Sequence, residues 1–284
     1  MTGASGSGER ILAILDVFTE ERLEWTPGEL MERLGYSRPT LYRYLKLLKE
    51  AGFLSALPNR GYTLGPRVVE LDFLMRQSDP VVDQGAAEVD GLAARHPCSA
   101  LLVRFYGDKL LCVKSACSIP NPVSSYPRGR PMPLARGAIS RAILAFLPRR
   151  QQAPLIEARL ADMTATGLGE TVDDVIVSLR KVRRSGIAIA HGEVTPGVVG
   201  IAAPVFDAGR APIAALCMTI AASEVGTGAR TLTALAADVK RTAEAISAAL
   251  SDRRDEAADC ATHQATFQIA PKIAAKTAGR GDPS

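Results

Sequence analysis

The chain has 284 residues, of which 47% are apolar and 23% are charged, and its formal net charge is +4. This composition is typical of a soluble globular protein, and the length predicts two domains. The sequence has no secretory leader and no apolar run of membrane length, so we expect a cytoplasmic protein without a membrane partner. The five cysteines are scattered and odd in number, which favours reduced thiols over a disulfide framework.

Two short helices joined by a tight turn are predicted near the N-terminus, after a first helix that begins at about Glu9. Thr26 and Glu29 match a capping box, and Pro27 occupies the first helical position, so a helix is predicted to begin there. Gly35 follows the last apolar residue of this helix and is predicted to form the turn.

A third helix is predicted from Ser37 to about Ala51. Its apolar positions are spaced by three and four residues and are predicted to be buried: Leu41, Tyr44, Leu45 and Leu48. The residues left near the exposed side are Arg38, Pro39, Thr40, Tyr42, Arg43 and Lys46. Arginine can pair with guanine in the major groove, and lysine, threonine and tyrosine can contact phosphates. We therefore expect this face to bind DNA, with Arg43 at a base; the alternative is a solvated charged face.

Two apolar runs around the turn Pro58–Gly61 predict a β-hairpin, the wing of a winged helix. Arg60 at its tip is a candidate contact for a phosphate or for the minor groove, or else a solvated side chain. A helix is predicted from Pro66 to about Arg76. It either pairs with the same helix of a second copy or is buried against the second domain.

The rest of the chain predicts an α+β domain, with helices on the faces of a sheet and no βαβ repeat. The predicted strands are 99–106, 109–116, 187–190, 198–206 and 212–220, and the predicted helices are 80–95, 137–147, 151–163, 172–184 and 227–250. Residues 119–133 are predicted to be a loop because they are rich in proline. The predicted segments are a disordered lead-in at 1–8, a winged helix-turn-helix at 9–65, a linker helix at 66–78, the second domain at 79–251 and a disordered tail at 252–284.

No catalytic or cofactor motif is present in the sequence. It contains no G-x-S-x-G, Walker, H-E-x-x-H or dinucleotide-binding pattern, so we expect no catalytic residue and no cofactor. Cys112 and Cys117 lack the C-x-x-C spacing of a metal site, and we expect no metal. Two alternatives stay open: an enzyme that uses Cys112, Cys117 or Cys217 as its nucleophile, and an architectural DNA-binding protein whose second domain is filled.

Two loops of the second domain carry candidate ligand contacts. His191 and Glu193 lie in a polar loop between two strands and either bind a ligand or face solvent. The loop Pro120–Arg136 carries three arginines, Arg128, Arg130 and Arg136. An arginine there can neutralise an anionic ligand, and the alternative is that all three are exposed.

Three stretches of the sequence match, in order, the pattern of one known family. They are ILAILDVF…GYTLG at 11–65, PMPLARGAISRAILAFLP at 131–148 and RRSGIAIAHGE…AALCMTI at 183–220. Together they resemble the IclR-type bacterial transcriptional regulators over about residues 9–251. The chain departs from the family at Ser140-Arg141, where many members have Gly-Lys, and at Ala135, where a histidine is usual.

The resemblance implies a winged helix-turn-helix, a linker helix and a GAF-like C-terminal α/β domain that binds a small organic effector, such as an organic acid. It implies a homodimer or a dimer of dimers on a palindromic double-stranded DNA operator, acting as repressor or activator of a catabolic operon. By position, the effector pocket of the family falls on Ser124, Tyr126, Ala138, Ile139, His191, Glu193, Val198, Gly200, Ala202 and Cys217.

Overall fold

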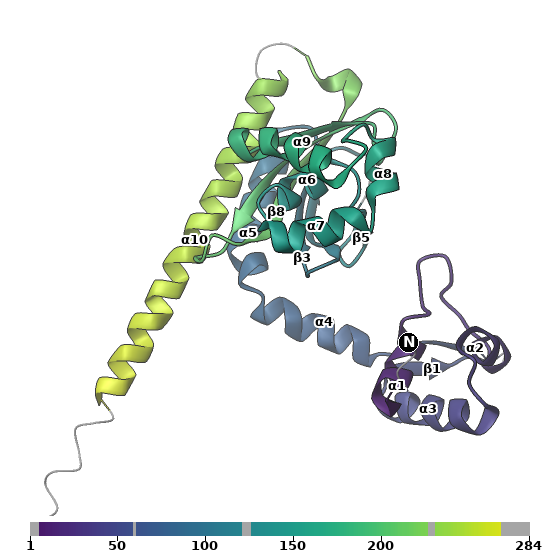
Figure 1. Cartoon of the computed structure of the whole chain (residues 1–284). Helices are drawn as coiled ribbons and strands as arrows, with labels where there is room; N and C mark the ends of the chain where they lie inside the picture. Colours follow the sequence, from purple (N-terminus) through teal and green to yellow (C-terminus); the bar gives the residue numbers. More distant parts are fainter. Residues whose placement is uncertain (1–5, 59–60, 121–125, 227–230, 268–284) are drawn as a thin grey trace, which may run out of the picture. The chain divides into compact units, whose positions relative to one another are not determined.

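The structure is a computed structural model of the chain. It describes residues 6–58, 61–120, 126–226 and 231–267, with the side chains of the last helix as far as Arg253. The chain divides between Asp79 and Pro80 into two compact units, and each unit has its own hydrophobic core (Figure 1).

The first unit contains a winged helix-turn-helix followed by one further helix. Its elements are α1 (Ser7–Leu15), α2 (Pro27–Leu34), α3 (Arg38–Glu50), β1 (Leu54–Ala56), β2 (Tyr62–Leu64) and α4 (Arg67–Ser78). Helix α1 begins inside the stretch 1–8 that the sequence predicts to be disordered. The Glu9 carboxylate accepts a hydrogen bond from the Gly6 amide at 3.1 Å, which starts the helix earlier than its apolar residues indicate.

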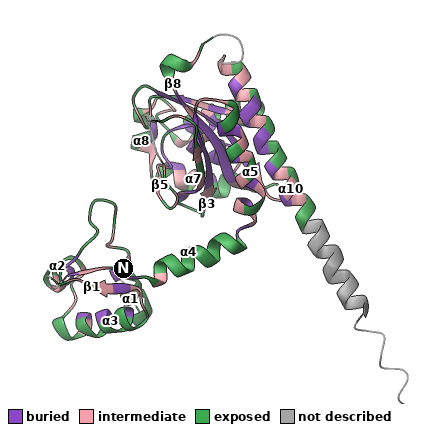
Figure 2. Ribbon diagram, turned by 180° about the vertical axis from the view of Figure 1, so that it is seen from behind, coloured by how far each residue is buried: buried purple, intermediate pink, exposed green. Residues whose placement is uncertain are grey.

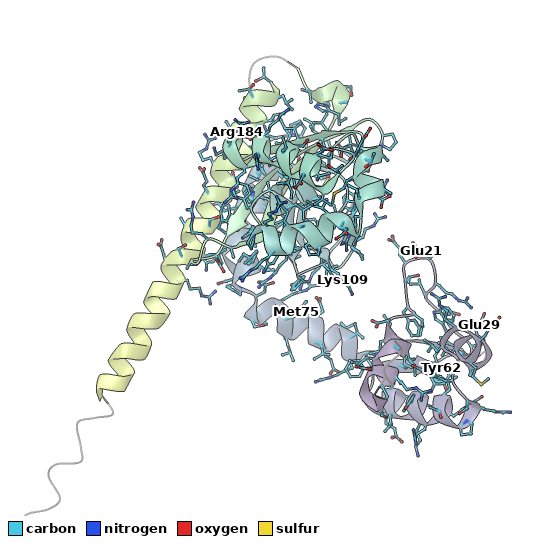
Figure 3. The ribbon with its side chains drawn as sticks, viewed as in Figure 1. Glu21, Glu29, Tyr62, Met75, Lys109 and Arg184 are labelled. Atoms are coloured by element: carbon cyan, nitrogen blue, oxygen red, sulfur yellow. The ribbon has the colours of Figure 1, made fainter. Side chains whose placement is uncertain are left out.

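The start of α2 confirms the predicted capping box. The Thr26 hydroxyl accepts a hydrogen bond from the Glu29 amide at 3.4 Å, and the Glu29 carboxylate accepts one from the Thr26 amide at 2.8 Å. Gly35 ends the helix with φ of 67°, a left-handed conformation that favours glycine. Tyr62 of the wing, marked with Glu29 in Figure 3, exchanges backbone hydrogen bonds of 3.0 and 2.8 Å with Trp25. The chain before α2 is thereby fixed to the wing.

The core of the first unit forms where α3 meets the other elements. As predicted, Leu41, Tyr44, Leu45 and Leu48 of α3 are buried, and they pack in one cluster with Ile14, Trp25, Leu30 and Leu54. The predicted hairpin is confirmed, with Leu54 opposite Leu64. Its tip at residues 59 and 60 lies outside the described residues.

The second unit is built on a six-stranded antiparallel sheet in the order β5-β4-β3-β8-β7-β6. Its strands are β3 (Ser99–Phe105), β4 (Leu110–Cys117), β5 (Pro131–Met132), β6 (Ala188–His191), β7 (Val198–Phe206) and β8 (Pro212–Ala221). Its helices are α5 (Pro80–Arg95), α6 (Ala138–Leu144), α7 (Arg149–Glu157), α8 (Leu160–Ala165), α9 (Val172–Ser185), the 3-10 helix η1 (Ala222–Glu224) and α10 (Leu232–Phe267).

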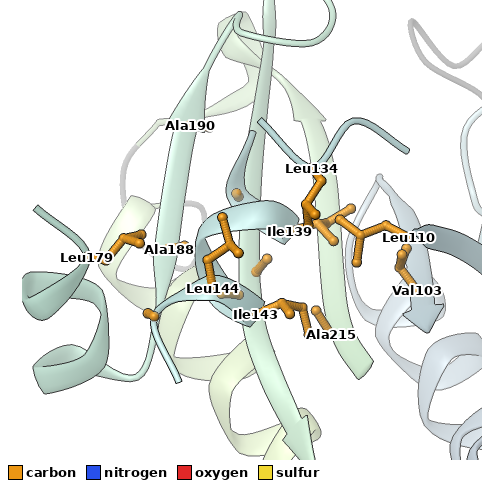
Figure 4. Packing of buried hydrophobic residues seen from close by; sticks show 14 of the residues in the cluster. Val103, Leu110, Leu134, Ile139, Ile143, Leu144, Leu179, Ala188, Ala190 and Ala215 are labelled. Atoms are coloured by element: carbon orange, nitrogen blue, oxygen red, sulfur yellow. The ribbon is translucent and has the colours of Figure 1, made fainter. Parts of the chain in front are cut away.

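Helices cover both faces of this sheet, and each face has a separate core. Helices α5 and α10 pack on one face and α6 to α9 on the other (Figures 1 and 2). Alternate residues of β8 enter the two cores: Ala215 and Cys217 lie in the cluster with α6, and Leu216 and Met218 lie in the cluster with α10. Figure 4 shows the first cluster, with Ala215 below α6. Because both faces are covered, the strands read as continuous apolar runs.

Three elements differ from the sequence prediction. The helix predicted at 151–163 is two helices, α7 and α8, because Arg159 leaves the helical conformation with φ of −132°. The short strand β5 lies in the predicted loop 119–133. Helix α10 begins at Leu232 and continues to Phe267, into the predicted disordered tail. Residues 251–267 are rich in alanine and contain no glycine or proline, so they favour a helix without an apolar period.

Candidate functional site

The exposed face of α3 is a candidate DNA-contact surface, because the predicted contact residues come together on it. The side chains exposed on this face are Arg38, Pro39, Tyr42, Arg43 and Lys46. Thr40 is only half-buried, and its hydroxyl oxygen accepts a hydrogen bond from Ser37 at 2.9 Å. The opposite side of the helix enters the core, so this face is the one that α3 can offer to a partner.

Aromatic rings support two arginines of this face. The Arg38 guanidinium lies 5.6 Å from the centre of the Tyr42 ring, and the Arg43 guanidinium lies 5.2 Å from the centre of the Tyr44 ring. Both distances are within the range of a cation–π contact. Because the Tyr44 ring is buried, it gives the exposed Arg43 side chain a rigid surface to pack on.

Lys46 is the other cation of the α3 face, and it lies 3.8 Å from the Glu50 carboxylate one helical turn later. An exposed ion pair of this kind contributes about 0–1 kcal/mol, so a phosphate can displace the glutamate easily. Arg60, the predicted contact at the wing tip, lies outside the described residues.

A cavity in the second unit opens between the start of α6 and the strands β6, β7 and β8. It is lined by Tyr126, Met132, Pro133, Arg136, Gly137, Ala138, Ile139, Ala190, Glu193, Val194, Thr195, Val198, Gly200, Cys217 and Thr219. It encloses about 470 Å³ including its open mouth. Small-molecule pockets typically span roughly 300–1,000 Å³, so the cavity fits a small molecule rather than a dinucleotide.

Most of the residues predicted for the effector pocket line this cavity. They are Tyr126, Ala138, Ile139, Glu193, Val198, Gly200 and Cys217. His191 and Ala202 do not line it. Neighbouring strand residues face opposite ways: Ala190 enters the cavity, so His191 is exposed on the other side of β6. Ala202 is fully buried in the core further along β7, and Ser124 lies outside the described residues.

Glu193 ties the loop over the cavity to the start of α6. One carboxylate oxygen accepts a hydrogen bond from the Gly137 amide at 2.9 Å, and the other lies 2.5 Å from the Arg141 guanidinium. Arg141 also donates to the Ile189 carbonyl at 3.2 Å. The Arg141 and Glu193 side chains are only 14% and 15% exposed. The protein itself thus binds the Glu193 carboxylate. Arg141 stands where many family members have lysine, and it retains the positive charge that pairs with Glu193.

The three predicted loop arginines have three different environments. Arg128 donates to the Val113 carbonyl at 2.6 Å, and the Arg130 guanidinium lies 5.2 Å from the centre of the Tyr126 ring. Arg136 is exposed at the cavity wall and makes no hydrogen bond or ion pair with any residue that the structure describes. A guanidinium in that position can bind the carboxylate of a ligand through two hydrogen bonds.

Burial makes three thiols of the second unit poor nucleophiles. It raises the pKa of Cys98 and of Cys217 to about 12 and the pKa of Cys112 to about 11. The thiolate is the reactive form, so these groups are protonated at neutral pH. Cys217 therefore contributes a small, weakly polar surface to the cavity. Within the described residues, no group of three His, Cys, Asp or Glu side chains is placed to hold a metal ion.

Sequence reasoning missed part of the cavity wall. The residues not assigned to the pocket are Met132, Pro133, Gly137, Ala190, Val194, Thr195 and Thr219. Strand alternation was a usable signal for Thr219, because it faces the same side of β8 as Cys217. Thr195 had no local signal: its hydroxyl lies 3.3 Å from the Tyr126 hydroxyl, which is distant in sequence.

Two domain models of a single family match the chain. The IclR helix-turn-helix domain matches residues 7–58, and the C-terminal domain of the bacterial transcriptional regulator IclR matches residues 100–248. The chain belongs to the IclR family. This membership confirms the resemblance seen in the sequence and makes the protein a DNA-binding transcriptional regulator with an effector-binding domain, not an enzyme. Among the described residues, no helix has both the length and the apolar character needed to cross a membrane.

Individual IclR-family proteins are similar over most of their length. The HTH-type transcriptional regulator XynR of Escherichia coli (strain K12) is 25% identical over 77% of this chain and 87% of its own. The crystal structure of the IclR transcriptional regulator from Alicyclobacillus acidocaldarius matches with a TM-score of 0.70 and 25% identity, over 86% of this chain and 98% of that chain. An IclR homologue of Microbacterium hydrocarbonoxydans, complexed with 4-hydroxybenzoate, shares the fold with a TM-score of 0.71 and 18% identity, over 86% and 99% of the two chains.

Proposed function

We propose that this IclR-family regulator controls a catabolic operon and that a small organic acid in the cavity of the second unit sets its affinity for the operator. The observation that carries the proposal is Arg136, a guanidinium at the cavity wall without a partner among the described residues. A ligand with a carboxylate supplies that partner, and the cavity size limits the ligand to a small molecule.

The lining of the cavity favours an acid with an apolar or aromatic body. Met132, Ile139 and Val198 supply apolar surface, and Thr219 supplies a hydroxyl group. This mixture of an apolar wall with a few polar groups is typical of small-molecule sites. The 4-hydroxybenzoate bound by the relative from Microbacterium hydrocarbonoxydans is an acid of this class. An architectural protein with a filled second domain is a weaker alternative, because the cavity offers space that such a protein does not need.

We further propose that the protein works as a homodimer on a palindromic operator. Helix α4 has no buried residue and exposes Val68, Val69, Leu71, Phe73, Leu74 and Met75. The ribbon of α4 has mostly the colour of exposed residues in Figure 2, and Figure 3 labels Met75. So many exposed apolar side chains on one helix usually mark an interface, and the same helix of a second copy is its natural partner. Two recognition helices related by a twofold axis read a palindromic site.

Binding experiments on the full chain test the effector proposal. We expect calorimetric titration with aromatic acids, keto acids and sugar acids to give at least one acid that binds, and its methyl ester to bind more weakly. Replacing Arg136 with alanine removes a charge-assisted hydrogen bond, so the Kd for the acid should rise about tenfold. Arg150→Ala is the matched control, because Arg150 is exposed on α7 away from the cavity.

DNA binding supplies the second readout for the same proposal. A DNA fragment selected from a random pool by the protein itself serves as the operator in a gel-shift assay. The acid that binds should change the affinity for this fragment in the parent protein at a concentration that has no effect on Arg136→Ala. An ester that binds as tightly as its acid, or an acid that binds without changing DNA affinity, contradicts the proposal.

A further inference from the structure

A second depression lies at the edge of the sheet in the second unit and shares no lining residue with the effector cavity. It forms where α9 ends beside α10, at the side of the unit where Figure 3 labels Arg184. It encloses about 890 Å³ including open solvent. The function proposed above makes no use of this surface.

The depression is strongly basic. Arg183 and Arg184 of α9, Arg210 of the β7–β8 turn and Lys240 of α10 line it, and Glu244 is the only acidic lining residue. Four cations around one concave surface repel each other and raise the local potential. A concave wall focuses this field, so the site attracts a multiply charged anion.

Two of the cations are already positioned by the protein. Lys240 donates to the Ser185 carbonyl at 2.8 Å, and the carbon chain of Lys240 passes over Gly186 at the end of α9. Arg210 has φ of 63°, and it is the only residue other than glycine with positive φ in the described part of the chain. That conformation is uncommon for a residue with a side chain. It brings the Arg210 guanidinium to 5.4 Å from the centre of the Phe206 ring.

The other two cations are free to bind. Arg183 and Arg184 are exposed, and neither makes a hydrogen bond or ion pair with a residue that the structure describes. The position of Arg183 and Arg184 at the end of α9 has an ordinary explanation, since cations stabilise helix C-termini. That explanation does not extend to Arg210 of the β7–β8 turn and Lys240 of α10, which line the same depression.

The floor of the depression is aromatic. The half-buried rings of Phe146 and Phe206 meet edge to face with 5.1 Å between their centres.

The edge of β7 beside these rings is poorly suited to pairing with an added strand. Strand β6 pairs only with residues 199–202 of β7, but Pro204 has no amide hydrogen and the Phe206 amide donates to Ser247 at 3.0 Å. The site therefore fits a small ligand better than an extended peptide.

We propose that this basic depression binds a phosphorylated small molecule that carries a planar ring, of the nucleotide type. Arginine suits phosphate because its guanidinium donates two parallel hydrogen bonds, and Arg183 and Arg184 supply two such groups. The ring of the ligand packs on the phenylalanine floor and beside the Arg210 guanidinium. The site is distinct from the effector cavity, so it gives the regulator a second ligand input.

Calorimetric titration of the full chain with ADP tests the proposal, with pyrophosphate and adenosine as separate arms. We expect ADP to bind more tightly than pyrophosphate, and adenosine to bind weakest of the three. The double variant Arg183→Gln/Arg184→Gln should raise the Kd for ADP about tenfold or more, because charge-assisted hydrogen bonds are lost. The matched control is Arg180→Gln/Lys181→Gln, which removes the same charge from exposed positions of the same helix outside the depression.

Each other outcome overturns part or all of the assignment. Absence of ADP binding at low salt, or an equal loss in the control variant, removes the site. Equal affinity for pyrophosphate and ADP removes the planar ring from the proposal. Loss of ADP binding in Arg136→Ala moves the ligand to the effector cavity. If Arg183→Gln/Arg184→Gln instead weakens binding to random-sequence DNA and leaves ADP unaffected, the depression is a DNA contact.

Discussion

At the scale of single residues, the charged groups of the two units differ in how they are held. Arg43 projects from α3 with its guanidinium beside a buried ring, whereas Arg141 and Glu193 form an ion pair that is largely shielded from water. An exposed cation can exchange water for a ligand at little cost. A shielded ion pair often contributes little net stability, because both charges lose their hydration. Removing one partner is nevertheless costly, because it leaves a buried charge unpaired.

Replacing Arg43 with alanine should weaken operator binding by about 1–3 kcal/mol if this residue contacts a base. The measurement is a gel-shift titration with the selected operator and with random-sequence DNA. A base contact predicts a larger loss on the operator than on random DNA. Lys49→Ala is the control for charge alone, because Lys49 is exposed at the other end of α3. Equal losses in the two variants on both DNAs would remove Arg43 as a base contact.

Replacing Glu193 with glutamine should destabilise the second unit. The glutamine oxygen can still accept a hydrogen bond from the Gly137 amide, but the Arg141 charge loses its partner in a largely buried position. Breaking such a pair costs roughly 3–5 kcal/mol. Urea unfolding followed by circular dichroism measures the change. Glu157→Gln, at an exposed position of α7, should stay within about 0.5 kcal/mol of the parent protein. A small effect at Glu193 would show that water reaches Arg141 readily.

At the scale of elements, α4 and the α5–α10 pair present contrasting surfaces. Helix α4 exposes apolar side chains along its length, with Val69 and Phe73 at 72% and 60% exposure. Helix α10 instead packs against α5, and its buried Asp238 carboxylate binds side chains at the end of α5. Asp238 accepts hydrogen bonds from His96 at 2.7 Å, Arg95 at 3.2 Å and Arg241 at 2.6 Å.

The double variant Val69→Lys/Phe73→Lys should convert a dimer into a monomer. These residues lie one turn apart on α4, so like charges at both positions of each copy would repel across the proposed interface. Sedimentation velocity at several protein concentrations measures the oligomeric state. Arg67→Lys/Arg76→Lys, at the two ends of the same helix, conserves charge and should leave the state unchanged. A parent protein that sediments as a monomer at micromolar concentration would contradict the dimer proposal.

Asp238 should make the second unit sensitive to acid. Burial alone raises the pKa of Asp238, but hydrogen bonds from His96, Arg95 and Arg241 outweigh burial and lower the pKa to about 2. The pKa in the unfolded chain is about 4, so the carboxylate contributes about 2 kcal/mol of stability above pH 4. That contribution is lost as the pH falls from about 4 through about 2. Asp238 lies in a shallow depression between α5 and α10, and Glu88 is the other acidic side chain that lines it.

Urea unfolding between pH 2 and pH 7 measures this contribution. Asp238→Asn should be less stable than the parent protein near neutral pH, and the difference between the two stability curves should shrink as the pH falls from about 4 and be mostly gone at about pH 2. Asp252→Asn is the control, because Asp252 is exposed on the same helix. A difference between parent and Asp238→Asn that stays constant down to pH 2 would show that packing, not charge, explains the loss.

At the scale of the whole molecule, the DNA-binding part and the effector-binding part of the chain have separate hydrophobic cores. All residues of the first core precede residue 80, and all residues of the two sheet cores follow it. A fragment that begins at Pro80 therefore keeps every buried contact of its unit. We expect this fragment to unfold in one cooperative thermal transition and to bind the effector with the affinity of the full chain. A fragment that fails to fold would show that residues before 80 complete its core.

Local chemistry explains how much of the fold was predictable from the sequence. The capping box at Thr26 and Glu29 and the left-handed turn at Gly35 each depend on contacts within a few residues, so the sequence located α2. The spacing of apolar residues separated the buried and exposed sides of α3 for the same reason. The end of α10 was missed because residues 251–267 carry no apolar period in the sequence.

The sequence by itself determined the two domains, the capped start of α2, the exposed basic face of α3 and most strands, because period, caps and turns act over short distances. Only the tertiary structure decided the strand order β5-β4-β3-β8-β7-β6, in which sequence neighbours are not always sheet neighbours. That order places Cys217 beside the start of α6 and turns His191 away from the cavity. The pairing of Arg141 with Glu193 also depends on it, since strand register, not local sequence, brings distant side chains together.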